Sequence, residues 1–122
     1  MQFAAQIFRQ QARERGRAIA LAFAGESISF TALERRTNQV AHALLREGAS
    51  PRDRVAMLSR NCARFFEILG GAAKARVCLA PINIRLSISE IAFILKDMAP
   101  KLLIVSKEFL PIAVQALSLI HI

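Results

Sequence analysis

The residues that could ligate a metal are few in this chain of 122 residues. Its thiols and imidazoles, the groups that zinc prefers, are those of Cys62, Cys78, His42 and His121. Zinc sites bring such ligands together in close pairs, whereas Cys78 follows Cys62 by 16 positions and no C-x-x-C pair occurs. We therefore expect no metal site. Both cysteines lie in apolar segments, which predicts that they are small buried hydrophobic side chains.

The segment Gly70-Gly71-Ala72-Ala73-Lys74-Ala75 comes nearest to a phosphate-binding loop. Its glycines and lysine do not have the G-x-x-x-x-G-K-[ST] spacing, and a predicted strand follows the segment where such a loop needs a strand to precede it. No G-x-G-x-x-G pattern is present either. We expect these small residues to belong to a helix that lies close to a sheet.

Acid–base and nucleophilic catalysis have no recognisable residue set in the sequence. His42 stands alone near the polar side of its predicted helix, which predicts a solvated side chain rather than a catalytic base. The acidic residues are scattered singly, and no Ser, His and Asp form a known pattern. The sequence therefore predicts no catalytic, cofactor-binding or metal-binding residue within residues 1–122.

The composition excludes several classes of protein. With 54% hydrophobic residues and a mean hydropathy of +0.36, the chain is too apolar for a disordered segment. Charges interrupt the apolar stretches before the roughly 20 residues that span a bilayer, and no secretory signal is recognisable, so we expect a cytoplasmic protein. The net charge of +8 comes mainly from arginines spread along the chain, and Trp and Tyr are absent. This pattern predicts a solvated basic face or a contact with a larger protein, not nucleic-acid binding.

The elements that must position these residues alternate along the chain. Continuous apolar runs at 55–58, 77–80 and 102–105 are typical of strands buried on both faces, and segments of helical period separate them. Two strand–helix–strand units predict an α/β fold with a mostly parallel sheet and flanking helices. Upstream, residues 18–23 and 27–30 predict a strand pair, and residues 1–15 predict a helix.

Three helix ends are marked by their residue types. Thr31 with Glu34, and Ser87 with Glu90, match the capping boxes that begin helices. Arg76 follows the last residues of a predicted helix and precedes a buried run. It therefore occupies the position that commonly takes the left-handed backbone conformation.

Several short segments resemble the motifs of one enzyme family. Ser29-Phe30-Thr31-Ala32-Leu33 resembles its first core motif, and the stretch from Ala73-Lys74-Ala75 to Pro81-Ile82-Asn83 resembles its second. Similar residues stand in order at Gly48, Asp53-Arg54-Val55, Asn61, Arg85-Leu86 and Glu90. The family is that of the AMP-forming adenylate synthetases, which includes acyl-CoA synthetases, peptide-synthetase adenylation domains and luciferases. The resemblance covers about residues 15–110 and implies the N-terminal, incomplete subdomain of the adenylate-forming fold.

The resemblance implies an enzyme that uses ATP and Mg²⁺ to activate a carboxylic acid as an acyl-adenylate. The acyl group then passes to a thiol, usually that of coenzyme A. The segment PINIRLSISEIAFIL resembles fatty-acid ligases, whereas peptide-synthetase domains tend to carry Asp where Asn83 stands. The family's phosphate loop, adenylate-binding Glu motif, ribose-binding Asp and catalytic Lys have no counterpart within residues 1–122. We therefore expect residues 1–122 to be a partial AMP-binding domain that is inactive alone and truncated at its C-terminus, where the apolar stretch 110–122 is either cut or ends in a few residues foreign to the fold.

The matched residues are expected to have structural roles. Asn61 is expected to cap the helix that follows it, and Asp53 to lie in the turn before the first buried strand. Pro81 is expected to end a strand, and Arg85 to pair with a carboxylate. The expected partners are the remainder of the parent ligase and a small carboxylic acid. The alternative that the sequence leaves open is a standalone basic α/β module that binds a protein partner or nucleic acid.

Overall fold

The computed structural model describes residues 2–120, with side chains from residue 6 onward. His121 lies outside the described residues. In chain order the elements are α1 (Gln2–Arg15), β1 (Ile19–Phe23), β2 (Glu26–Ser29), α2 (Phe30–Arg46), β3 (Arg54–Leu58), α3 (Ala63–Ala75), β4 (Cys78–Pro81), α4 (Ile88–Met98), β5 (Leu102–Val105), the 3-10 helix η1 (Lys107–Phe109) and α5 (Leu110–Ile120). The helix predicted over residues 1–15 and the alternation of strands and helices from residue 54 onward are confirmed over the described residues.

The strands form two separate sheets. β1 and β2 pair antiparallel as a hairpin, with Phe23 opposite Glu26, which confirms the predicted strand pair. β4, β3 and β5 form a parallel sheet in that order, and Val55 of β3 lies opposite Leu79 on one side and Leu102 on the other. The predicted α/β class, with a mostly parallel sheet and flanking helices, is confirmed.

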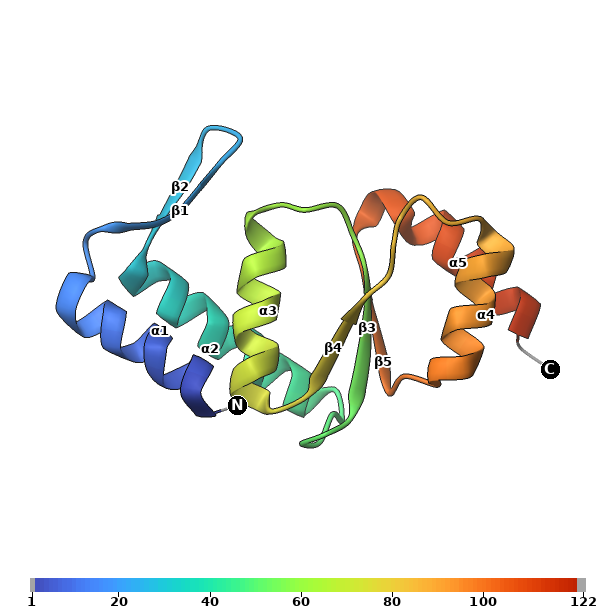
Figure 1. The fold of residues 1–122 in the computed structure, drawn as a ribbon, viewed down its shortest axis with the longest axis horizontal. Helices are drawn as coiled ribbons and strands as arrows, with labels where there is room; N and C mark the ends of the chain where they lie inside the picture. The colour runs from blue at the N-terminus through green and yellow to red at the C-terminus, as the bar shows by residue number, and fades with distance from the viewer. Residues whose placement is uncertain (1, 121–122) are drawn as a thin grey trace.

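β3 is the middle strand of its sheet, and helices cover both faces of that sheet (Figure 1). Val55 packs with buried residues of α2 and α3, while Ala56 and Leu58 pack with buried residues of α4 and α5. The residues from Val55 to Leu58 are each at most 2% exposed. This burial on both faces explains why the strand reads as an unbroken apolar run.

α2 and α3 approach each other more closely than ordinary side chains allow. A Cβ atom on Gly71 would lie 2.4 Å from Cβ of Val40, and one on Gly70 would lie 2.6 Å from Cγ2 of Thr37. The prediction that these small residues belong to a helix close to a sheet is confirmed, since Ala72 and Ala75 pack with Val55 of β3. Gly70 and Gly71, however, face the neighbouring helix α2. The absence of side chains at these two positions is what lets the two helices touch.

The side chain of Lys74 in α3 bonds to several residues of α2. Its ammonium group forms an ion pair with the carboxylate of Glu34 and donates to Thr37 Oγ1 at 2.7 Å and to Asn38 Oδ1 at 2.8 Å. The ammonium also lies 5.6 Å from the ring centre of Phe8 in α1. The side chain of Lys74 is only 9% exposed. A lysine so far buried needs such a set of partners, so Lys74 joins α1, α2 and α3.

The start of α2 differs from the prediction. Ser29 caps the helix, since its hydroxyl accepts a hydrogen bond from the Ala32 amide at 3.1 Å. Thr31 lies inside the first turn, where its amide donates to the carbonyl of Gly16 at 3.0 Å. The predicted capping box of Thr31 and Glu34 is therefore wrong: the cap lies two residues earlier.

α3 and α4 begin differently: α3 has no side-chain cap, whereas α4 begins with a capping box. α3 begins after Cys62, whose backbone is extended and whose side chain makes no capping hydrogen bond, so Asn61 does not cap it. At α4 the amide of Glu90 donates to Ser87 Oγ at 3.1 Å, and the Ser87 amide donates to Glu90 Oε1 at 2.9 Å. The predicted capping box is confirmed. The hydrogen bonds from the backbone and side chain of Ser87 lower the pKa of the Glu90 carboxyl below its ordinary value.

Candidate functional site

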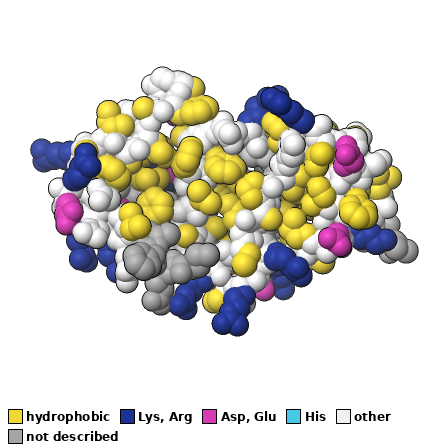
Figure 2. All heavy atoms as spheres, in the orientation of Figure 1, with side chains coloured by type: hydrophobic (Ala, Val, Ile, Leu, Met, Phe, Trp, Pro, Cys, Tyr) yellow, Lys and Arg dark blue, Asp and Glu magenta, His cyan; other side chains and the backbone are white. Residues whose placement is uncertain are grey.

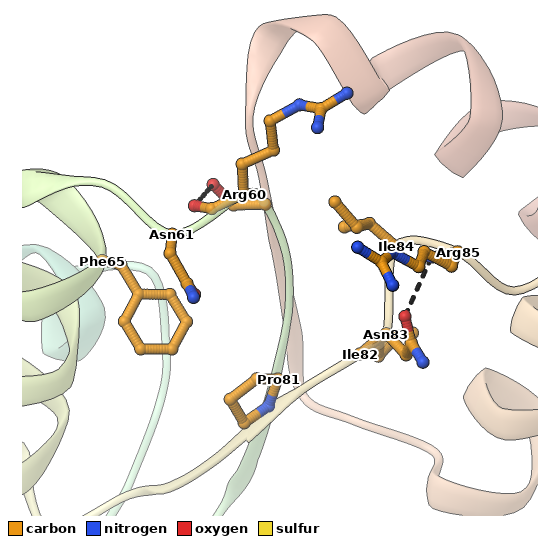
Figure 3. A pocket seen from close by; sticks show the side chains of 9 residues that line it. Arg60, Asn61, Phe65, Pro81, Ile82, Asn83, Ile84 and Arg85 are labelled. Carbon is orange, nitrogen blue, oxygen red and sulfur yellow. Dashed lines mark hydrogen bonds between the residues drawn. The ribbon is translucent and has the colours of Figure 1, made fainter. Parts of the chain in front are cut away.

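A cleft of about 480 Å³ opens at the carboxyl ends of β3 and β4 (Figure 3). It is lined by the loop after β3, by the first turn of α3, and by the end of β4 with the loop that follows it. The lining residues are Ser59, Arg60, Asn61, Phe65, Pro81, Ile82, Asn83, Ile84 and Arg85. Carboxyl ends of adjacent parallel strands are the usual position for ligand sites in open α/β sheets.

The fold sets the position of each wall. Pro81 is the last residue of β4, as predicted, and forms the floor of the cleft (Figure 3). Asn83 Oδ1 accepts a hydrogen bond from the amide of Arg85 at 2.9 Å, which fixes the turn that carries Arg85. Asn61 and the ring of Phe65 form the opposite wall at the start of α3 (Figure 3).

The two arginines of the cleft have different surroundings. Arg85 directs its guanidinium group across the cleft toward Asn61 and Phe65 (Figure 3). It forms no ion pair with any of the described residues, so its predicted carboxylate partner is not found there. Arg60 turns away and donates from Nε to Glu108 Oε1 at 3.0 Å. The free positive charge of the cleft is therefore that of Arg85.

The cleft can bind but has little means to catalyse. No acidic residue, cysteine or histidine is among its lining residues. Its one hydroxyl, on Ser59, donates to the carbonyl of Arg60 at 3.0 Å and has no neighbouring base. A guanidinium, a carboxamide and an aromatic face can hold an anionic or planar group of a ligand. The arrangement fits a positioning surface for a larger site.

The cysteines and the possible metal ligands are placed apart. Cys62 is half-buried and Cys78 is exposed, so the prediction that both are buried hydrophobic side chains is wrong. Cys78 is the first residue of β4, where its side chain reaches solvent. His42 is exposed on α2, as predicted. Over the described residues, no three His, Cys, Asp or Glu side chains gather in a group that could hold a metal ion.

The residues singled out by motif do not form a single site. Asn61, Asn83 and Arg85 meet in the cleft, whereas Ser29 lies at the start of α2 and Lys74 lies between α2 and α3. Asp53 lies in the predicted turn, where its Oδ2 accepts from the Ser50 amide at 2.7 Å. Sequence reasoning missed the cleft as a site. The signal available was that polar residues directly follow two neighbouring parallel strands.

The surface adds no concentrated charge on the face shown in Figure 2. Lys and Arg side chains lie around its rim, while hydrophobic side chains occupy much of its middle (Figure 2). Within residues 2–120, no helix is both long and apolar enough to cross a membrane.

Comparison with known proteins decides the family. The family described as AMP-binding enzyme matches residues 8–120. The chain belongs to this family. It is 40% identical over 88 residues to the fatty acid–[acyl-carrier-protein] ligase ScoC of Streptomyces coeruleorubidus, a match that covers 72% of this chain and 17% of that protein. It is 36% identical over 89 residues to the crotonobetaine/carnitine–CoA ligase of Citrobacter koseri, covering 73% of this chain and 17% of that protein.

Solved structures agree with this family assignment. The fatty acyl-CoA synthetase of Mycobacterium tuberculosis superposes with a TM-score of 0.85 at 29% identity, over 90% of this chain and 22% of that chain. The parallel sheet and its helices therefore have the arrangement found in adenylate-forming enzymes. The chain spans about a sixth of the length of the two curated relatives named above.

Proposed function

We propose that residues 1–122 are the partial N-terminal region of the AMP-binding domain of an acyl-CoA synthetase. The supporting observation is the family match over residues 8–120, together with relatives that are ligases of about six times the matched length. The complete enzyme would join a carboxylate oxygen to the α-phosphorus of ATP and release pyrophosphate. A thiol, that of coenzyme A, would then attack the acyl carbon of the adenylate and release AMP.

Within this enzyme the described residues serve as scaffold. The cleft between Asn61 and Arg85 offers a binding surface without an acid, a base or a nucleophile beside a base. We assign to residues 1–122 no catalytic, cofactor-ligating or metal-ligating side chain. ATP, Mg²⁺ and coenzyme A are required by the complete enzyme, and the remainder of the parent ligase is the partner of this region. The fatty-acid-like segment from Pro81 to Leu95 favours coenzyme A ligation over a peptide-synthetase module.

ATP–pyrophosphate exchange tests the proposal. The purified 122-residue chain is expected to show no exchange above a heat-killed control with any carboxylic acid, because the phosphate loop and catalytic Lys of the family lie outside it. The complete parent enzyme, recovered by reading the coding sequence past residue 122, is expected to show exchange with its own acid. Exchange by the 122-residue chain, or a longer reading frame without a phosphate loop, contradicts the proposal.

A further inference from the structure

Another cavity, of about 400 Å³, lies at the carboxyl ends of β3 and β5. Leu58 and Val105, the last residues of these strands, are register partners, so the segments that follow the two strands meet at one edge of the sheet. Residues of both strands, of both following segments and of α3 line the cavity. It shares only Ser59 with the cleft described above, which opens between β3 and β4. The two are therefore separate sites.

Two cations form the rim of this cavity. Arg64, near the start of α3, and Lys107, after β5, both line it, and both are exposed. The acids nearest to them in sequence, Glu67 and Glu108, are paired with other arginines at 3.0 Å. Neither Arg64 nor Lys107 forms an ion pair with another described residue. The rim thus carries two positive charges that an anion can neutralise.

The interior of the cavity is apolar apart from one hydroxyl. Met57 of β3 and Ile104 of β5 are register partners, and both line the cavity together with Ile68 of α3. Ser106 Oγ is fully buried and has no hydrogen-bond partner among the described residues. Native structures rarely leave a buried hydroxyl in this state, because the lost hydration is not repaid. The hydroxyl therefore points to a polar group that a ligand supplies.

A cationic rim around an apolar interior selects an amphipathic anion. Small-molecule sites usually have apolar walls with a few polar groups that fix the orientation of the ligand, and a volume near 400 Å³ is in their usual range. A phosphate ion needs polar partners on all sides, which apolar walls do not provide. A monocarboxylate needs them only at its head, and its alkyl tail gains free energy by leaving water.

We infer that this cavity binds a small monocarboxylate with a short alkyl tail. The carboxylate lies between Arg64 and Lys107, and the tail packs against Met57 and Ile104. Ser106 donates its hydroxyl to the carboxylate head. The inference does not depend on the proposed function, because every residue that it uses is described.

Cys62 reports on occupation of the cavity, because it is half-buried and lines it, whereas Cys78 is exposed at the start of β4. The complete parent enzyme is alkylated with iodoacetamide, an uncharged reagent, at constant ionic strength and without ATP. Mass spectrometry of the two cysteine peptides gives the two rates. Saturating hexanoate is expected to slow alkylation of Cys62 at least about fivefold by covering the thiol, and to leave Cys78 unchanged.

Two smaller probes separate the head of the ligand from its tail. Acetate lacks four methylenes, each worth up to about fourfold in affinity, and is expected to need at least about ten times the concentration of hexanoate for half-protection. Hexanamide keeps the tail but not the charge, and is expected to need a similar excess. Phosphate or hexanamide that protects Cys62 as strongly as hexanoate overturns the inference.

Variants of the rim show whether protection arises in this cavity. Arg64→Gln and Lys107→Gln are each expected to raise the half-protecting concentration of hexanoate at least about fivefold, since each removes a charged partner of the carboxylate. Arg35→Gln is the matched control, because Arg35 is exposed on α2 and does not line the cavity, and a change of less than about twofold is expected. Protection that survives both rim variants places hexanoate elsewhere, and a Cys62 that does not react in the native enzyme shows a closed cavity. Either result overturns the inference.

Discussion

Arg76 holds a left-handed backbone at the end of α3, with φ 64° and ψ 28°, as its position in the sequence predicts. Its carbonyl accepts from the Arg52 amide at 2.8 Å, so neighbouring hydrogen bonds keep the residue in this conformation. A residue with a side chain is disfavoured there by about 1–2 kcal/mol, and glycine is not. A cation at a helix C-terminus recovers roughly 0.3–1 kcal/mol, less when solvated.

Arg76→Gly is therefore expected to stabilise the complete parent enzyme by about 0.5–1 kcal/mol, after allowance for the greater freedom of glycine in the unfolded chain. Denaturant melts of the two proteins measure the difference. Arg54→Gly is the control, because Arg54 lies in the extended strand β3, where glycine brings only its entropic cost. A midpoint that falls with Arg76→Gly shows that the arginine gains more from its surroundings than its backbone conformation costs.

Unlike the exposed Arg76, Lys74 is a charged residue whose side chain is almost fully buried. The side chains of Lys74 and Glu34 are 9% and 19% exposed, and the ammonium has further oxygen partners on α2. Removing one member of such a pair leaves a poorly hydrated charge. Lys74→Met is expected to destabilise the parent enzyme by about 2–3 kcal/mol, below the value for a fully buried pair because Glu34 keeps some contact with water.

A double-mutant cycle separates the ion pair from simple loss of packing. Glu34→Leu combined with Lys74→Met removes both charges, so at least half of the lost stability is expected to return. Urea unfolding of the two single variants and the double variant gives the coupling. Strict additivity of the two single effects would show that the ion pair contributes nothing of its own.

At the scale of elements, the cap of α2 can be tested directly. Ser29→Ala removes the side-chain oxygen that accepts from the Ala32 amide and is expected to cost about 1 kcal/mol. Thr31→Ala is the matched control, and it is expected to be near neutral because the hydrogen bond of Thr31 to Gly16 is made through its backbone amide and its side chain is exposed. Thermal melts compare the two. A larger loss with Thr31→Ala would restore Thr31 as the cap.

The element pattern was predictable where local chemistry decides it. The buried strands could be predicted because their sequences lack polar alternation. The start of α4 could be predicted because both hydrogen bonds of its capping box are between Ser87 and Glu90, which are three positions apart. The start of α2 could not, because Glu34 bonds instead to Lys74, a residue 40 positions away. A local pattern gives no information about such a competing partner.

The cleft shows the same limit for the candidate site. The polar residues after β3 and β4 were visible in the sequence, and each was given a separate structural role. Their convergence depends on β3 and β4 being parallel neighbours and on the Asn83 turn that directs Arg85 into the cleft. The parallel pairing was predicted, but the direction of one guanidinium depends on contacts that no spacing rule supplies.

At the scale of the whole molecule, the helices that cover the two faces of the parallel sheet are held together in different ways. On one face, α2 and α3 lie in close contact through Gly70 and Gly71 and are joined by Lys74. Both faces leave apolar side chains exposed, and the most exposed of them are Phe93 at 72% on α4 and Leu119 at 60% on α5, compared with Leu45 at 47% on α2. The α4–α5 side has no buried ion pair among the described residues, and β5 ends the described sheet with an unpaired edge.

The isolated 122-residue chain is accordingly expected to be poorly soluble or loosely packed, and to open first at α4, β5 and α5. Opening there uncovers the buried cluster that includes Ile91 and Leu95 but breaks no buried ion pair. Separating α2 from α3 breaks the buried ion pair of Lys74 and also uncovers tight packing. Hydrogen exchange in the isolated chain measures the order: amides of α4 and α5 are expected to exchange faster than those of α2 and α3. A monodisperse monomer with one sharp transition and uniform protection would contradict this. In that case the apolar groups left exposed on α4 and α5 do not weaken their half of the fold, and the sheet is stable with β5 as a free edge.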